Sequence, residues 1–199
     1  MDLCGYNTMS TSKVWLVTGA SRGWGLSLVK QLLAAGHQVA ATSRNVKRLK
    51  DAVGVIDKTH FLPLAVDLNN TDCIDESIRQ TLEAFGKIDV VVNNAGYYAG
   101  GPMEDMENRT IRDLIDINLI AAMEVTKQVL PVLKAQRSGH IINVGVPEGM
   151  DGTPGAAVYL ATKAALKAFS EALSREVAAY GIKVMMARPA ELRQLLSWK

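Results

Sequence analysis

Two side chains suited to proton transfer, Tyr159 and Lys163, are four positions apart in a segment with helical periodicity. Residues at this spacing project from one face of a helix, so the phenol and the ammonium can act together. A phenol has a reference pKa of about 10 and exchanges protons poorly near neutral pH. A nearby ammonium favours the phenolate and is expected to lower that pKa. The pair predicts an acid–base site, with a structural pair on the helix surface as the alternative.

The glycine-rich segment TGASRGWG at 18–25 is a candidate phosphate-binding loop. Gly19, Gly23 and Gly25 have the spacing G-x3-G-x-G and separate an apolar run from a helical pattern, with Ser21 and Arg22 between them. Glycines allow a sharp turn and a close approach to a pyrophosphate. The helix that follows offers free N–H groups and the positive end of its dipole to the anion. A tight turn without a ligand is the alternative.

The residues at the end of the second apolar run bear on the choice of dinucleotide. An enzyme that selects NAD usually has an acid there, which binds the ribose 2′-hydroxyl. This chain has Ser43 followed by Arg44. A guanidinium can bind a 2′-phosphate through paired hydrogen bonds, and Arg22 is a second candidate for this contact. The pattern favours NADP over NAD, although each arginine alone is also consistent with a solvated surface charge.

Strand-like and helix-like segments alternate along the chain. Six short apolar runs are candidate strands, namely 13–18, 38–43, 61–66, 88–93, 140–146 and 182–188. Strands joined by helices predict a doubly wound parallel sheet of the Rossmann type in a single α/β domain. Two long helices are expected at 110–136 and 154–180. Asn118 lies on the apolar stripe of the first, where a polar side chain needs partners.

Three motifs in the same order and spacing resemble the short-chain dehydrogenase/reductase family: TGASRGWG, NNAG at 93–96, and YLATK at 159–163. The similarity covers 13–189, so the fold is expected to be shortened after the sixth strand. It implies that Tyr159 exchanges a proton with the substrate oxygen while a hydride moves to or from the nicotinamide. It also implies that Lys163 holds the nicotinamide ribose and that Asn118 holds a water of the proton relay.

The same resemblance implies contacts along the whole cofactor. Asp67 is expected to contact the adenine amine, or else to act as a helix N-cap. The NNAG motif is expected to line the cofactor and to tie the central strands together, a structural role that would by itself explain these residues. The predicted cofactor-binding set is Gly19, Ser21, Arg22, Gly23, Gly25, Arg44, Asp67, Asn94, Ala95, Gly96, Tyr159, Lys163 and Pro189.

The chain departs from the family pattern in two places. Family members carry a serine thirteen positions before the tyrosine, and here that position is Val146. Losing one such hydrogen-bond donor costs about 2.7–4 kcal/mol of transition-state stabilisation. Candidate substitutes are Asn143, Tyr97, Tyr98 and Thr153. Near the C-terminus the expected Pro-Gly and hydroxyl residue are replaced by Pro189-Ala190 and Gln194, and the family's substrate-covering helices and seventh strand do not follow.

Composition limits the classes of function. The chain has 199 residues, 48% hydrophobic and 21% charged, with a net charge of +2, so neither disorder nor a nucleic-acid surface is indicated. Cys4 and Cys73 have no metal-ligand spacing, and no metal site is predicted. Neither a secretory signal nor a run of membrane-spanning length is evident. We expect a cytoplasmic protein with a flexible arm at 1–12, a catalytic domain at 13–199, and no membrane partner.

The leading hypothesis is an NADP-dependent oxidoreductase that interconverts a small alcohol and a carbonyl. A non-catalytic NADP-binding or dimerising module is the main alternative, favoured by Val146 and Ala190. Non-redox chemistry on the same scaffold, such as isomerisation, is a third. A symmetric homodimer through the two long helices is also expected, because both carry apolar residues off the main stripe, such as Met123, Leu130 and Ala168.

Overall fold

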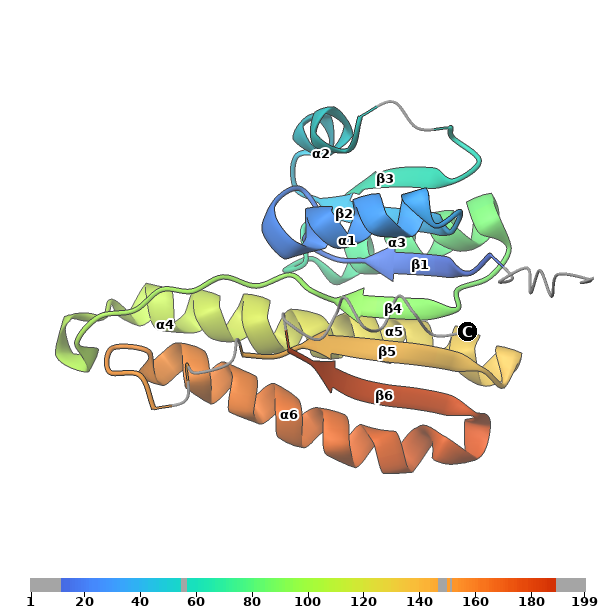
Figure 1. The fold of residues 1–199 in the computed structure, drawn as a ribbon. Coiled ribbons are helices and arrows are strands. Elements are labelled where there is room, and N and C mark those ends of the chain that lie inside the picture. The colour runs from blue at the N-terminus through green and yellow to red at the C-terminus, as the bar shows by residue number, and fades with distance from the viewer. Residues whose placement is uncertain (1–11, 55–56, 147–149, 151, 189–199) are drawn as a thin grey trace, which may run out of the picture.

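Six parallel strands form one sheet in the order β3-β2-β1-β4-β5-β6 (Figure 1). The structure is a computed structural model that describes residues 12–54, 57–146, 150 and 152–188. Its strands are β1 (Val14–Val17), β2 (Gln38–Ser43), β3 (Phe61–Ala65), β4 (Val90–Asn93), β5 (Gly139–Val144) and β6 (Ile182–Ala187). The strand order reverses between β1 and β4, and ligands of open α/β sheets bind beside the carboxyl ends of strands at such a point. The predicted doubly wound α/β fold is confirmed.

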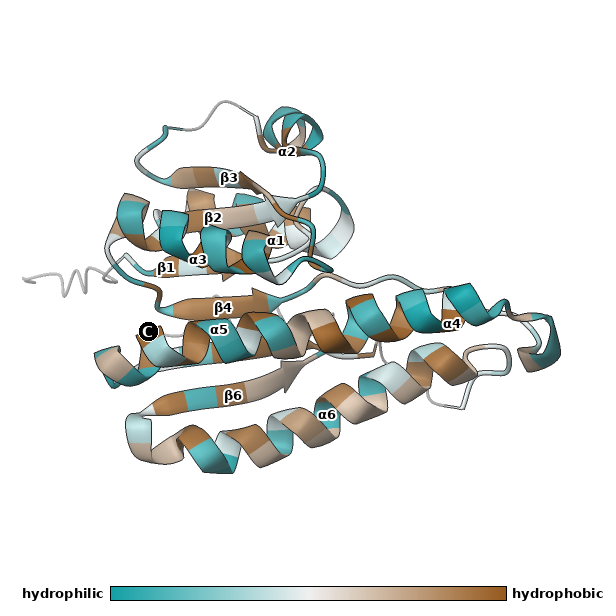
Figure 2. Ribbon diagram, turned by 180° about the vertical axis from the view of Figure 1, so that it is seen from behind, coloured by the Kyte–Doolittle hydropathy of each residue, from teal (hydrophilic) through white to brown (hydrophobic). Residues whose placement is uncertain are grey.

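Helices cover both faces of the sheet. The apolar sides of α1 (Gly23–Ala34) and α2 (Val46–Val53) pack in one core layer, and those of α3 (Thr71–Phe85), α5 (Ala121–Gln136) and α6 (Ala157–Val177) pack in the other. Each helix carries both hydrophilic and hydrophobic residues, whereas the strands are mostly hydrophobic (Figure 2). This division places the sheet between the two layers.

Alternation along each strand explains why the strands read as unbroken apolar runs. Val90 and Val92 of β4 belong to the α1 layer, whereas Val91 between them belongs to the α3 layer. In β1, Trp15 and Val17 likewise face the first layer and Leu16 the second. Successive side chains of a strand point to opposite faces, so a sheet covered on both sides needs apolar residues at every position.

The long helix expected at 110–136 is interrupted by a π-helical turn. Helix α4 (Asn108–Ile115) continues through the π turn, Asp116–Ile120, into α5. The predicted start at 110 is two residues later than the observed start at Asn108, and the prediction did not include the π turn. Such turns insert an extra residue into a helix and occur often at functional sites. One inserted residue leaves the spacing of the apolar residues on either side nearly regular, so the stripe in the sequence does not reveal the turn.

The second long helix is shorter than expected from the sequence. Helix α6 begins at Ala157 rather than near 154, and it ends at Val177 before the 3₁₀ turn Ala178–Tyr180. Gly181 follows with a φ of +70°, a left-handed conformation that glycine adopts without a side-chain clash. The predicted arm at 1–12 falls almost wholly outside the described residues, as do Cys4, Pro189, Ala190 and Gln194.

Candidate active site

The glycine loop joins the end of β1 to the start of α1, beside the NNAG segment that follows β4. Gly19 and Gly23 have φ of +67° and +56°, which glycine adopts at low cost. A Cβ added at Gly19 would lie 2.7 Å from the Cα of Ala95, and one added at Gly25 would lie 2.4 Å from Asn94 Nδ2. Two of the three glycines are therefore required by close packing against the NNAG segment, and Gly23 by its backbone conformation.

Thr18, which is not among the residues predicted from the sequence for the site, links the two segments. Its Oγ1 accepts hydrogen bonds from the backbone N–H of Asn94 at 3.1 Å and of Ala95 at 3.0 Å. Asn94 Nδ2 returns bonds to the carbonyls of Thr18 at 2.8 Å and Gly19 at 3.1 Å. The expected structural role of Asn94 is thus present. The signal for Thr18 was its place directly before the first glycine.

The start of α1 can accept an anion. Arg22 is the N-cap residue, its side chain makes no capping bond, and the first turn holds no acidic residue. The free N–H groups of this turn and the helix dipole favour a bound phosphate. Arg22 and Arg44 are both exposed, and neither forms an ion pair within the part of the chain that the structure describes. Both guanidiniums are therefore available to a ligand.

Residues after β2 and β3 are held by local hydrogen bonds. The Ser43 hydroxyl accepts a bond from the N–H of Asn45, which in turn caps α2 by accepting from the N–H of Arg48 at 2.9 Å. Asp67 accepts a bond from the N–H of Asn69 at 3.0 Å and is exposed. The N-cap of α3 is Asn70. The N-cap interpretation of Asp67 is therefore wrong, and its contact with adenine stays a prediction.

Tyr159 and Lys163 lie in the first turns of α6 and are 9% and 5% exposed. Lys163 Nζ donates a hydrogen bond of 2.9 Å to the carbonyl of Val144, at the end of β5. Burial lowers the pKa of Lys163 from 10.5 to about 8, and burial raises the pKa of Tyr159. The ammonium is 5.9 Å from the centre of the Tyr159 ring. The expected lowering of the tyrosine pKa is absent from this structure, because desolvation of the phenolate prevails.

Asn118 lies in the π turn and is 1% exposed. Its Oδ1 accepts a bond from the N–H of Tyr97, and its Nδ2 donates one to the carbonyl of Tyr97, both at 2.9 Å. The partners that a buried amide requires are thus found. A Cβ added at Gly96 would lie 3.0 Å from Asn118 Oδ1 and 3.6 Å from Lys163 Nζ. NNAG, Asn118 and Lys163 therefore meet at one place, while the relay water stays a prediction.

The substitutes considered for the missing serine differ in their surroundings. Asn143 is fully buried, accepts a bond from Asn93 Nδ2 at 2.8 Å and donates one to Ser170 Oγ at 2.7 Å. Its amide is used by the core, so it is not a substitute. Thr153 is exposed and donates its hydroxyl hydrogen to the Met150 carbonyl. Val146 itself is half-buried, two residues beyond β5.

The backbone of Tyr97 is held by Asn118, and the next residue brings an aromatic ring to the site. The rings of Tyr98 and Tyr159 have centroids 5.4 Å apart and an interplanar angle of 80°. Of the four candidates, Tyr98 is the one whose ring contacts the predicted proton donor. Pro189, which was predicted to contact the nicotinamide, lies outside the residues that the structure describes, so this contact stays a prediction.

A glycine loop of the dinucleotide-binding type lies where the strand order reverses, and a buried Tyr-Lys pair lies at the same end of the sheet. Together they define a dinucleotide-dependent acid–base site. The short chain dehydrogenase family model matches residues 13–195, and the chain belongs to that family. The oxidoreductase BOA17 of Botryotinia fuckeliana is 37% identical over 182 residues, which are 92% of this chain and 66% of the fungal protein. The chain thus spans slightly less than two thirds of that relative.

Solved structures agree with this assignment. A short-chain dehydrogenase from Streptomyces avermitilis has a TM-score of 0.82 at 36% identity, covering 88% of this chain and 64% of that one. A metagenomic short-chain oxidoreductase in complex with NADP has a TM-score of 0.82 at 28% identity, covering 93% and 89%. A 3-ketoacyl-(acyl-carrier-protein) reductase from Brucella melitensis complexed with NADH has a TM-score of 0.80 at 27% identity, covering 87% and 74%. Both kinds of cofactor thus occur among the neighbours.

Proposed function

We propose that the protein is an NADP-dependent oxidoreductase that interconverts a small alcohol and a carbonyl by hydride transfer. The observation that carries this proposal is the meeting of the glycine loop, the NNAG segment, Asn118 and the Tyr159–Lys163 pair at one end of the sheet. These groups come from four separate parts of the chain. A purely structural role for the Tyr-Lys pair does not account for a lysine that is buried beside the glycine of NNAG.

The donor set fits a nicotinamide dinucleotide. The open first turn of α1 is suited to the pyrophosphate, and Arg22 and Arg44 are suited to a 2′-phosphate. Lys163 carries three N–H donors, and Val144 is its one hydrogen-bond acceptor within the described residues. The remaining donors can bind a ribose hydroxyl. The bound cofactor would supply the hydride.

Tyr159 then serves as the proton donor to the substrate oxygen. Burial raises its pKa, so the phenol stays protonated at neutral pH and is ready for carbonyl reduction. Alcohol oxidation needs the phenolate and is expected to require more alkaline conditions. Asn118 fixes the backbone of Tyr97 and thereby the loop that follows NNAG. With Val146 in place of a hydroxyl, we expect a rate about a hundred- to a thousandfold below that of a site with the donor.

The test of the reaction compares two variants with the parent, using a panel of carbonyls and NADPH oxidation followed at the nicotinamide absorbance. Tyr159→Phe should abolish turnover, because it removes the proton donor and keeps the ring. Val146→Ser should raise turnover, because it restores a hydroxyl near the carbonyl oxygen. Activity that survives in Tyr159→Phe would refute the catalytic assignment.

A non-catalytic NADP-binding or dimerising role is the second candidate. It is favoured by Val146 and by the full commitment of Asn143 to Asn93 and Ser170. In that case the parent binds NADPH but oxidises none of it with any carbonyl, and Val146→Ser alone does not restore turnover. The same panel therefore separates the two candidates.

The preference for NADP is tested by one charge reversal. The exposed Arg44 at the end of β2 supports tighter binding of NADPH than NADH, by about tenfold or more if one charge-assisted pair contributes ~1.5–3 kcal/mol. Arg44→Asp should reverse the preference, since a carboxylate repels the 2′-phosphate and accepts a bond from a 2′-hydroxyl. Arg109→Asp, on the exposed surface of α4, is the matched control. Equal affinities of the parent for both cofactors would contradict the proposal.

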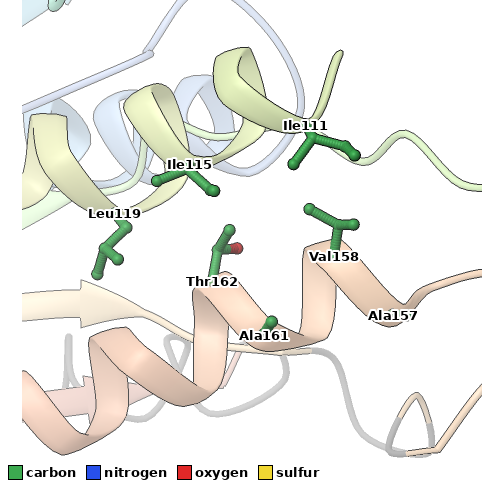
Figure 3. Close-up of a pocket in the computed structure, with 7 residues that line it drawn as sticks. All are labelled: Ile111, Ile115, Leu119, Ala157, Val158, Ala161 and Thr162. Carbon is green, nitrogen blue, oxygen red and sulfur yellow. The ribbon is translucent and has the colours of Figure 1, made fainter. Parts of the chain in front are cut away.

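A symmetric homodimer is also proposed, through an apolar groove between α4 and α6. Seven residues line this space of about 430 Å³: Ile111, Ile115, Leu119, Ala157, Val158, Ala161 and Thr162. Figure 3 shows the side chains of Ile111 and Ile115 facing those of Val158 and Thr162 across it. Ile115 is 38% exposed. Leu130, expected from the sequence to lie off the main apolar stripe, packs against the sheet core. The groove lies nearer the starts of the two helices than the sequence suggested.

Within the described residues, no helix is long and apolar enough to cross a membrane.

A further inference from the structure

A half-exposed aromatic ring stands next to the proposed proton donor. The Tyr98 side chain is 52% exposed, and its ring meets that of Tyr159 almost at a right angle, with centroids 5.4 Å apart. A large aromatic side chain that stays exposed to water does not contribute the stabilisation that its burial would give. Aromatic side chains commonly line ligand sites, so an exposed one beside reacting groups is a candidate for ligand contact. Tyr98 therefore needs an explanation that the proton transfer itself does not give.

The Tyr98 ring is held in place by its neighbours. Asn118 fixes the preceding peptide through its two bonds to the backbone of Tyr97. Three residues after Tyr98, the N–H of Gly101 donates a bond of 2.9 Å to the carbonyl of Gly155, close to the start of α6. The segment that carries Tyr98 is thus tied to the π turn on one side and to the loop before α6 on the other.

Gly100 provides the space in which the ring lies. A Cβ added at Gly100 would be 2.1 Å from Tyr98 Oη and 2.5 Å from Tyr98 Cζ. Any larger residue at position 100 must push the phenol end of Tyr98 away. The exposed ring is thus packed against a glycine and against Tyr159, and its position is set before any ligand arrives.

We infer that Tyr98 is a specificity-determining residue, the aromatic wall of a subsite that takes planar aryl or conjugated carbonyl compounds. The inference rests on the proposed function, because it places the substrate beside Tyr159. Two rings at 80° form a corner, and a flat group placed in it lies parallel to one ring and edge-on to the other. Both arrangements are favourable for aromatic pairs. A puckered saturated group of the same size cannot adopt either.

The binding test uses two amides that the enzyme cannot reduce, benzamide and cyclohexanecarboxamide. Both are titrated by NMR into the full chain, with and without NADP. They have the same number of heavy atoms, and one ring is planar whereas the other is puckered. We expect benzamide to bind about threefold to tenfold more tightly, the range typical of one aromatic pair.

Three variants then assign the preference to the ring. Tyr98→Phe keeps the ring and should keep the preference, whereas Tyr98→Leu keeps an apolar side chain and should lose it. Gly100→Ala leaves Tyr98 unchanged but displaces its ring, and should lose the preference as well. Circular dichroism and NADPH affinity of each variant show whether its fold and cofactor site are intact. Should Gly100→Ala fail to fold, the Phe and Leu variants still decide the question.

The kinetic counterpart uses benzaldehyde and cyclohexanecarboxaldehyde. If the parent reduces both, the ratio of their kcat/KM values should fall in Tyr98→Leu and stay unchanged in Tyr98→Phe. Equal binding of the two amides by the parent, or a preference that survives in Tyr98→Leu, would overturn the inference. An amide preference without NADPH oxidation by any carbonyl of the panel would instead refute the proposed oxidoreductase activity and leave the Tyr98 subsite supported. The two failures are therefore distinguishable.

Discussion

Lys163 is the residue at which stability and proposed function oppose each other. The residue is 5% exposed, and within the described part of the chain its ammonium makes one hydrogen bond, to the Val144 carbonyl. Burial of a charge is costly unless the group is paired. The fall of its pKa from 10.5 to about 8 corresponds to about 3 kcal/mol of destabilisation at neutral pH. Such a cost is typical of active sites, where function is retained at the expense of stability.

Replacing this lysine should therefore stabilise the fold. Lys163→Met keeps most of the volume and removes the charge, and we expect its free energy of unfolding at pH 7 to exceed the parent's by about 1–3 kcal/mol. The unfolded parent binds one more proton than the folded parent between pH 8 and 10.5, so the parent gains stability as pH rises through this window. The difference between the two proteins should thus shrink from pH 7 to pH 9.5.

Denaturant unfolding of both proteins at these two pH values measures the effect. Lys30→Met, at an exposed position of α1, is the control for loss of one positive charge. A variant that is less stable than the parent at pH 7 would show that the Val144 hydrogen bond outweighs the desolvation of the ammonium.

Among the elements, the π turn at 116–120 brings Asn118 to the loop that follows NNAG. Removing the amide leaves the N–H and the carbonyl of Tyr97 without their partner in a partly buried place. Asn118→Ala should therefore lower the free energy of unfolding by about 1–3 kcal/mol. Asn69→Ala, at an exposed position, is the matched control. A loss below about 0.5 kcal/mol for Asn118→Ala, typical of a surface change, would contradict this role.

The elements also show what a sequence can predict here. The strands and the glycine loop followed from local patterns, because apolar runs and glycine spacing report directly on a covered sheet and a tight turn. The π turn did not, since one inserted residue leaves the stripe nearly regular. The direction of the Tyr159 pKa and the hydrogen bonds of Asn143 depend on burial and on partners such as Ser170, which only the fold brings near.

At the scale of the whole molecule, the groove between α4 and α6 leaves apolar side chains uncovered. Burying such a surface against a second copy would favour association by about 25 cal/mol per Å². Light scattering at micromolar concentration should give a dimer for the parent. Ile115→Glu should give a monomer, because it places a charge within the groove. Arg109→Glu, on the same helix but outside the lining residues, should leave the dimer intact. A monomeric parent would refute the proposed assembly.

The pair Asn93 and Asn143 has a consequence for how such a sheet can change over evolution. The two residues are directly opposed in the register of β4 and β5, and their amides are bonded in the core. A slip of one residue would place Asn93 opposite Ile142 or Val144 and break the bond between the two amides. Replacing only one of the two by an apolar residue would break the same bond and leave the other amide with its remaining partners alone, Ala122 and Thr126 for Asn93 or Ser170 for Asn143. These two positions are therefore expected to vary jointly, because their shared hydrogen bond links the register of β4 and β5 to the identity of both residues.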